Sequence, residues 1–197
     1  MLISAIEDPA IPRRAIKRLA KARETSTSEG IFPKLVDDSG GLPRIKDQLP
    51  AIFHWKDHAP EGVDEAIREG FAQYRDTLLP AHRVLLDRYE IKDAAVKVVG
   101  VGSVGTACMV VLLMTGDGEP LILQVKEARP SVLEAYAGKS AFANHGQRVV
   151  NGHRLMQPAS DIFLGWTEGK TGRHFYLRQL RDVKIKPALL DLFYIVV

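Results

Sequence analysis

The feature that most constrains this fold is a glycine-rich turn between two segments that both have the composition of β-strands. The segment Gly100–Gly105 has the pattern G-x-G-x-x-G and joins Ala94–Val101 to Thr106–Met114. In a dinucleotide-binding unit these glycines open a helix whose amino end holds a pyrophosphate. Here a β-branched apolar run follows instead, so the sequence predicts strand, turn, strand and excludes that unit. A Walker-type loop is excluded too, because Gly105 is not followed directly by Lys and Ser or Thr.

A glycine-rich turn between two strands is also the architecture of the kinase loop whose backbone covers the phosphates of ATP. That chemistry needs a lysine on the next strand to neutralise the α- and β-phosphates. The next predicted strand, Leu121–Glu127, places Lys126 near its end. A lysine is otherwise unfavourable in so apolar a strand.

The alternative is a glycine-rich hairpin in which Lys126 lies at a sheet edge and extends its ammonium group to solvent. The glycines alone favour this alternative. Lys126 and the order of the following elements together shift the balance towards the kinase-like architecture.

A kinase also needs acidic groups, which this sequence supplies poorly. The helix after the lysine strand should provide a Glu that pairs with the lysine, but the predicted helix Ser140–Gln157 contains no acid. Gln147 and Asn151 are its uncharged counterparts, and Glu134 on a short preceding helix is the nearest candidate. The catalytic base and the metal-binding Asp normally lie in H-x-D and D-F-G motifs, and neither motif occurs in the sequence.

The elements after residue 94 follow the order three strands, helix, two strands. The helical region comprises Ser131–Tyr136 and Ser140–Gln157, and the last two strands are Asp161–Thr167 and His174–Leu180. The predicted fold class is therefore α+β: a five-stranded antiparallel sheet with a packed helix, resembling the amino-terminal lobe of a protein kinase.

The first 90 residues are predicted to form a helical and hairpin extension. The pattern gives a basic helix, two hairpin strands, a loop and two helices separated by Pro80. These segments are Pro12–Glu24, Ile31–Val36, Leu42–Ile45, residues 47–62, Val63–Leu79 and Ala81–Tyr89. The predicted domains are this extension (1–90), the kinase-like lobe (91–184) and an apolar tail (185–197).

Charge gives little support to a nucleic-acid partner. The 27 Lys and Arg exceed the 24 Asp and Glu by only three. The basic residues of Pro12–Glu24 cover more than one helix face, which more often indicates a solvated surface helix than a binding surface. Nucleic acid is therefore not expected as a partner.

The remaining composition favours a cytoplasmic protein without a membrane partner. The single cysteine, Cys108, excludes an intramolecular disulfide and is expected to be an inert core thiol. The longest apolar run, Ala107–Met114, is far shorter than the ~20 residues that span a bilayer. The first residues do not have the pattern of a signal peptide.

A weak metal motif lies in the front part of the chain. His54, Asp57 and His58 resemble the inverted zinc-protease pattern H-x-x-E-H with Asp in place of Glu. The segment lies between Pro50 and Pro60, which disfavours the helix that this chemistry needs. No metal site is expected there.

Several uncommon segments in a row resemble one bacterial family, catalogued as domain of unknown function 2252. They are VVGVGSVGT, LQVKEARPSVLEAYAGKS, FANHGQRVVNGHRLMQPASDIFLGWT and FYLRQLRDVK. The resemblance is strong over Ala94–Lys184 and looser over Lys21–Tyr89. Members of that family resemble the aminoglycoside-phosphotransferase-like and protein-kinase-like fold, and no activity is assigned to the family as a whole. The resemblance implies ATP and Mg²⁺ as cofactors and assigns nucleotide-contacting positions to Gly100, Gly102, Gly105 and Lys126. The predicted nucleotide site also includes Ser103, within the glycine segment, and Glu134, the candidate partner of the lysine.

The resemblance provides no catalytic acid. In complete members, which are longer, a G-D-x-H-x-x-N segment and a D-F-D segment precede the region seen here, and a helical part follows it. Residues 185–197 depart from the family pattern, as a truncated reading frame would. We therefore expect a nucleotide-binding, phosphotransferase-like lobe that is inactive alone and lacks the other half of a kinase-like protein. The alternative is a non-catalytic interaction module or a gene remnant without ligand.

Overall fold

The computed structural model describes residues 28–54, 63–100 and 105–180. The basic helix predicted over Pro12–Glu24 and the tail predicted over residues 185–197 lie outside the described residues.

The chain divides into two compact units, one made of residues 1–34 with 181–197 and the other of residues 35–180. In the first unit the structure describes residues 28–34, which form most of helix α2 (Ser28–Leu35). The second unit holds both sheets and all of the described site residues.

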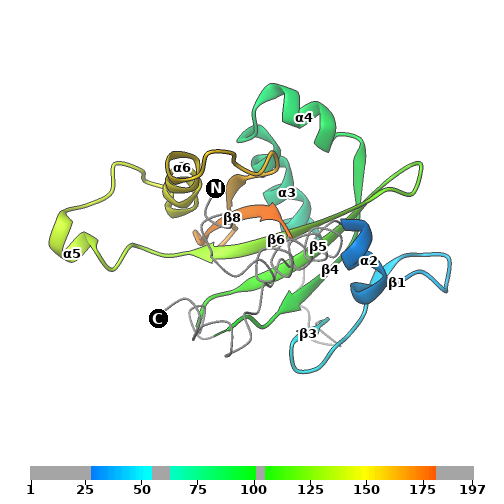
Figure 1. Ribbon diagram of the computed structural model, residues 1–197. Coiled ribbons are helices and arrows are strands. Elements are labelled where there is room, and N and C mark those ends of the chain that lie inside the picture. The colour runs from blue at the N-terminus through cyan, green and yellow to red at the C-terminus, as the bar shows by residue number, and fades with distance from the viewer. Residues whose placement is uncertain (1–27, 55–62, 101–104, 181–197) are drawn as a thin grey trace, which may run out of the picture. The chain divides into compact units, whose positions relative to one another are not determined.

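The second unit is built on a six-stranded sheet with the order β3-β4-β5-β6-β8-β7, in which every neighbouring pair is antiparallel (Figure 1). The order places β6 in the interior, between β5 and β8. The strands are β3 (Ile52–Phe53), β4 (Tyr89–Lys97), β5 (Cys108–Thr115), β6 (Pro120–Ala128), β7 (Gly165–Glu168) and β8 (His174–Gln179).

The prediction of five strands is wrong, because β3 adds a sixth at the edge of the sheet. Ile52 and Phe53 pair with Lys97 and Val96 of β4, inside the segment 47–62 that we predicted to be a loop. A strand of two residues is too short to show alternation in the sequence, and only its pairing with β4 reveals it.

The strand predicted from Ala94 begins five residues earlier, at Tyr89, so the helix predicted over Ala81–Tyr89 is too long. The pairing of β4 with β5 shifts register between Ile91 and Asp93. This irregularity places Tyr89, Ile91 and Ala94 against the same core cluster. A bulge breaks the period of two, and this break hides the first half of β4 from a search for alternation.

The hairpin near the amino end is present but smaller than predicted. The predicted strand Ile31–Val36 is wrong in its first part, which is helical in α2. β1 (Val36–Asp37) pairs with β2 (Arg44–Ile45). Pro33 lies inside α2, where a proline removes a helical donor, so local propensity disfavours the helix that the structure has.

One face of the main sheet packs against helices α3 (Val63–Asp76) and α4 (Pro80–Leu86), and the break predicted at Pro80 is confirmed. Tyr74 of α3 is fully buried, and its hydroxyl donates to the carbonyl oxygen of Phe163 at 2.7 Å. Burial raises the pKa of this phenol far above its usual value. The core on this face consists of Tyr74, Leu78, Leu86, Val111, Leu113, Leu121, Leu123, Phe163 and Leu177.

The helical region between β6 and β7 contains α5 (Glu134–Ala137) and α6 (His145–Met156). The ring of His153 in α6 lies 6.2 Å from the ring of Tyr176 in β8. Because successive strand residues point to opposite faces, Tyr176 lies on the face opposite to the core residue Leu177, and α6 contacts that second face. No helix in the described part of the chain is long and apolar enough to cross a membrane.

Close packing of α6 on β8 gives a prediction about two glycines of the same helix. A Cβ built at Gly146 would lie 2.2 Å from the backbone oxygen of Phe175, whereas one at Gly152 meets nothing within 4 Å. We expect Gly146→Ala to destabilise the protein by about 1–3 kcal/mol, because β8 backbone must move. Gly152→Ala should stabilise it by about 0.5–1 kcal/mol through helix propensity. Urea unfolding measures both, and changes of the same sign would contradict this packing.

Candidate functional site

The glycine-rich segment joins two neighbouring strands, as predicted. Gly100 follows the end of β4, and Gly105 precedes the start of β5. Gly102 and Ser103 lie outside the described residues. Gly105 has φ +76°, a backbone conformation that glycine adopts without the steric cost that other residues meet. A strand on each side of the segment, which is the context that distinguished it from a dinucleotide-binding turn, is confirmed.

Lys126 lies on an interior strand. Its Cα partners are Cys108 on β5 and Tyr176 on β8, so a hydrogen-bonded strand lies on each side of β6. The alternative of a lysine at a sheet edge is therefore wrong. The side chain of Lys126 is partly buried, and in the described part of the chain no carboxylate forms an ion pair with it.

Strand alternation places Lys126 on the second face of the sheet, away from the core around Tyr74. Leu121 and Leu123 of β6 belong to that core, so Gln124 and Lys126 point to the other side. Register puts further polar residues beside them. The set, which we call the cationic face, consists of Lys97, Cys108, Gln124, Lys126, Tyr176 and Arg178.

A chain of hydrogen bonds crosses three strands of the cationic face. Arg178 donates from Nε and Nη2 to the Gln124 carbonyl oxygen, at 3.4 and 3.2 Å. Gln124 in turn donates from Nε2 to the sulfur of Cys108 at 3.5 Å. Gln124 is only 5% exposed, and these contacts give both ends of its buried amide a partner.

The thiol of Cys108 lies in the electrostatic field of three cations. Burial raises the pKa of the thiol, while Lys126, Lys97 and Arg178 oppose that rise by favouring the thiolate. These cations come from β6, β4 and β8. Cys108 is 4% exposed, so the predicted core position is confirmed, but its surroundings are more polar than those of an ordinary core thiol.

Tyr176 belongs to the same electrostatic group. Burial raises the pKa of its phenol, Arg178 acts in the opposite direction and Cys108 adds to the rise. In the described residues the one side-chain partner of Arg178 is the neutral amide of Gln124. Among the described residues no carboxylate forms an ion pair with Lys126 or Arg178, and a face that carries several cations attracts anions.

The acidic partner proposed for Lys126 lies elsewhere. Glu134 is in the first turn of α5, where its carboxylate accepts a weak hydrogen bond from the backbone N–H of Ser131 at 3.4 Å. No ion pair between Glu134 and Lys126 occurs among the described residues. Of the uncharged counterparts, Asn151 donates to the backbone oxygen of Gln147 within α6.

His54 has partners other than those of a zinc motif. Its Nδ1 lies 2.8 Å from Asp47, and its Nε2 lies 3.0 Å from Asp93. His58 and Asp57 lie outside the described residues. Within the ranges that the structure describes, no group of three or more His, Cys, Asp or Glu side chains could hold a metal ion.

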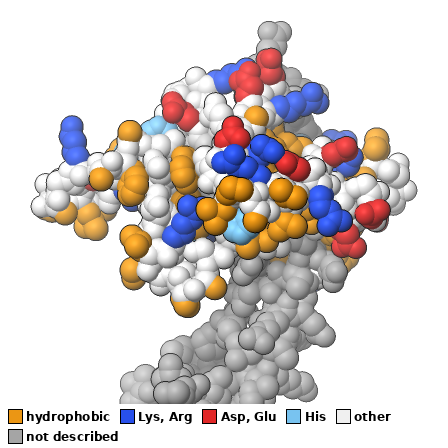
Figure 2. Space-filling model, turned by 90° about the horizontal axis from the view of Figure 1, so that it is seen from above, with side chains coloured by type: hydrophobic (Ala, Val, Ile, Leu, Met, Phe, Trp, Pro, Cys, Tyr) orange, Lys and Arg blue, Asp and Glu red, His pale blue; other side chains and the backbone are white. Residues whose placement is uncertain are grey.

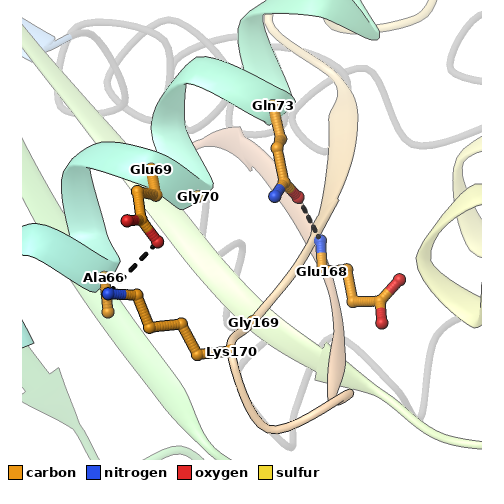
Figure 3. A pocket seen from close by; sticks show the side chains of 7 residues that line it. All are labelled: Ala66, Glu69, Gly70, Gln73, Glu168, Gly169 and Lys170. Carbon is orange, nitrogen blue, oxygen red and sulfur yellow. Dashed lines mark hydrogen bonds and ion pairs between the residues drawn. The ribbon is translucent and has the colours of Figure 1, made fainter.

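A surface pocket of about 280 Å³ lies between α3 and the turn that joins β7 to β8 (Figure 3). Its cation, Lys170, lies 3.2 Å from Glu69 and 3.4 Å from Glu65. Because carboxylates neutralise that lysine, this pocket is a poor site for an anion. None of the predicted site residues lines it: the lining residues are Ala66, Glu69, Gly70, Gln73, Glu168, Gly169 and Lys170.

Comparison with protein families matches residues 2–193 to the family described as "Uncharacterized protein conserved in bacteria (DUF2252)". The chain belongs to this family. The DUF2252 match includes residues 185–193, part of the tail that we expected to depart from the family pattern. No curated protein and no solved structure matches the chain.

Sequence reasoning missed four residues of the cationic face in this DUF2252 member, namely Lys97, Gln124, Tyr176 and Arg178. Gln124 lies two positions before Lys126, so alternation along β6 could have placed it on the same face. Arg178 and Tyr176 alternate in the same way along β8. The pairing of β8 with β6 could not be read from the chain order, because β7 comes first in sequence.

Cys108 provides a direct test of this electrostatic arrangement. Lys126→Met and Arg178→Met each remove a cation that favours the thiolate, so both should raise the pKa of Cys108. Ultraviolet absorbance of the thiolate, followed against pH in the folded protein, measures the change. Lys92→Met is the matched control, since Lys92 pairs with the exposed Glu90 on β4. Identical titration curves in all four proteins would contradict the arrangement.

Proposed function

We propose that the cationic face and the adjacent glycine-rich turn bind the phosphates of a nucleotide, with ATP as the expected ligand. The observation that carries this proposal is the strand register, which brings Lys97, Lys126 and Arg178 from β4, β6 and β8 onto the face of the sheet that holds Cys108. Lys126 and Arg178 are not neutralised by a carboxylate in the described residues. Charge-assisted hydrogen bonds to phosphate oxygens would satisfy them.

The glycine-rich turn supports the same ligand. It lies between β4, which ends at Lys97, and β5, which begins at Cys108, so both of its strands contribute residues to the cationic face. A backbone with glycines can approach a phosphate closely and present its N–H groups. The order three strands, helix, two strands, with the lysine on the third strand, is the order that led us to the kinase-like architecture.

The residues present do not fit a protein-held Mg²⁺. Carboxylate ligands are what such an ion requires, and the described ranges contain no suitable group of acidic side chains. We therefore propose binding of the nucleotide, with any Mg²⁺ arriving on its phosphates, and we propose no catalytic step for this chain. The lobe is phosphotransferase-like in its binding elements only.

A second candidate, a non-catalytic interaction module, is favoured by a different part of the molecule. Helix α5 lies on a long connection that projects from the sheet, and Figure 2 shows apolar side chains along this arm (Figures 1 and 2). Val132, Leu133 and Tyr136 are 84%, 64% and 90% exposed. Exposed apolar groups of this kind are typical of surfaces that bind another protein.

ATP binding can be tested by thermal unfolding of the recombinant chain. At ATP-Mg concentrations about 100-fold above Kd, a ligand stabilises the folded state by ~2.7 kcal/mol, so Tm should rise. Lys126→Ala should raise Kd by about 10- to 100-fold, since a hydrogen bond to a charged group contributes ~1.5–3 kcal/mol. Inorganic triphosphate should compete with ATP.

Lys92→Ala is the matched control, because it removes a lysine of the same sheet that pairs with Glu90. It should leave the ATP-dependent rise in Tm unchanged. The absence of any rise at millimolar ATP-Mg, or an equal rise in Lys126→Ala, would overturn nucleotide binding and favour the interaction module.

A further inference from the structure

Glu127 and Arg129, which lie one and three positions after Lys126, hold the backbone at the carboxyl end of the glycine-rich segment. Glu127 is the first: its side chain is only 7% exposed, and its Oε2 accepts from the backbone N–H of Ala107 at 2.8 Å. The backbone N–H of Glu127 also donates to the carbonyl oxygen of Ala107 at 2.8 Å. Ala107 lies between the turn and the start of β5, so Glu127 attaches this position to β6 twice.

Arg129 makes the second attachment. Its Nη2 donates to the carbonyl oxygen of Gly105, and its Nε forms an ion pair with Oε1 of Glu127 at 3.0 Å. Arg148 of α6 donates to the carbonyl oxygen of Arg129 at 2.8 Å. The guanidinium of Arg129 therefore joins Gly105 to β6, and its backbone is in turn held by the helix.

The charges of this group are balanced, in contrast to those of the cationic face. Burial disfavours the ionised carboxylate of Glu127, but the Ala107 amide and the Arg129 guanidinium together lower its pKa below the ordinary value. The pairing of β6 has no register shift at Glu127, and successive strand residues point to opposite faces. The side chain of Glu127 therefore points to the face opposite to Lys126. One short segment thus presents, on one face, a lysine that has no ion pair within the described part of the chain and, on the other, an acid–base pair with its partners in place.

We propose that Glu127 and Arg129 are positioning residues that fix the carboxyl end of the glycine-rich segment, Gly105 and Ala107, relative to Lys126. Both positions are attached to the strand that holds the lysine or to the residue that follows it, so their backbone is held at a fixed place beside β6. A phosphate group held between this end of the segment and Lys126 would meet both at a fixed separation. The effect on ligand affinity rests on the proposed nucleotide binding, whereas the attachment of the turn does not.

Amide hydrogen exchange of Ala107 tests the attachment without any ligand. Glu127→Ala removes the acceptor of this N–H and should speed its exchange by about tenfold or more. Glu127→Gln retains a carbonyl oxygen at the same place and should restore most of the protection. Glu90→Ala, which removes an exposed acid paired with Lys92 on the same sheet, is the control and should leave Ala107 unchanged.

If Glu127→Ala does not fold, variants of the more exposed Arg129 test whether the carboxyl end of the glycine-rich segment is attached to β6. Its side chain is 54% exposed, so Arg129→Ala should leave the fold intact while it speeds exchange near Gly105. Arg129→Lys should not restore protection, because one ammonium group cannot reproduce the two directed donors of the guanidinium.

Titration with ATP-Mg then tests the positioning role. Glu127→Ala should weaken binding by about tenfold with Lys126 in place, and Glu127→Gln should recover part of it. If the wild type does not bind ATP but exchange at Ala107 rises in Glu127→Ala, nucleotide binding fails and the attachment stands. Unchanged exchange in both alanine variants overturns the attachment. Faster exchange with unchanged ATP affinity overturns the positioning role.

Discussion

The pairing of β6 with a strand on each side is the constraint on which the rest of this structure depends. β5 brings Cys108 beside Lys126, and β8 brings Tyr176 and Arg178 to the same region. Had β6 been an edge strand, the ammonium group of Lys126 would extend into water. Its interior position holds the ammonium instead on a partly buried face where other cations gather.

The two faces of this sheet differ in the kind of side chain that they bury. On the face of Tyr74, apolar side chains of β5, β6 and β8 pack against α3 and α4, and the buried phenol satisfies its hydroxyl on Phe163. The cationic face gains less from burial, because like charges repel one another and lose hydration. A stable sheet does not need such a face, and this is why we assign the function to it and not to the pocket beside Lys170.

The lysine of the proposed site and the residues that support the glycine-rich segment come from one short stretch of the chain, whose side chains point to alternate faces of the sheet. Lys126 faces the cations, and Glu127 faces the opposite way and holds Ala107. Arg129 adds the attachment to Gly105. A glycine-rich turn needs conformational freedom to approach a ligand and a fixed base from which to do so. In our proposal the glycines supply the conformational freedom, and the pair of Glu127 and Arg129 supplies the fixed base.

The sequence by itself determined the strand–turn–strand around the glycines, the strand with Lys126, the helical region after it, the break at Pro80 and membership of a bacterial family. The structural features follow from local properties, namely alternation, β-branched runs and proline chemistry. Family membership rests instead on the resemblance of several uncommon segments. Tertiary structure alone decided that β3 joins the sheet, that β4 passes through a bulge, and that β8 lies beside β6. Each of these depends on pairing between residues far apart in the chain. For the same reason Arg178 and Lys97 could be assigned to the site only after the register was known.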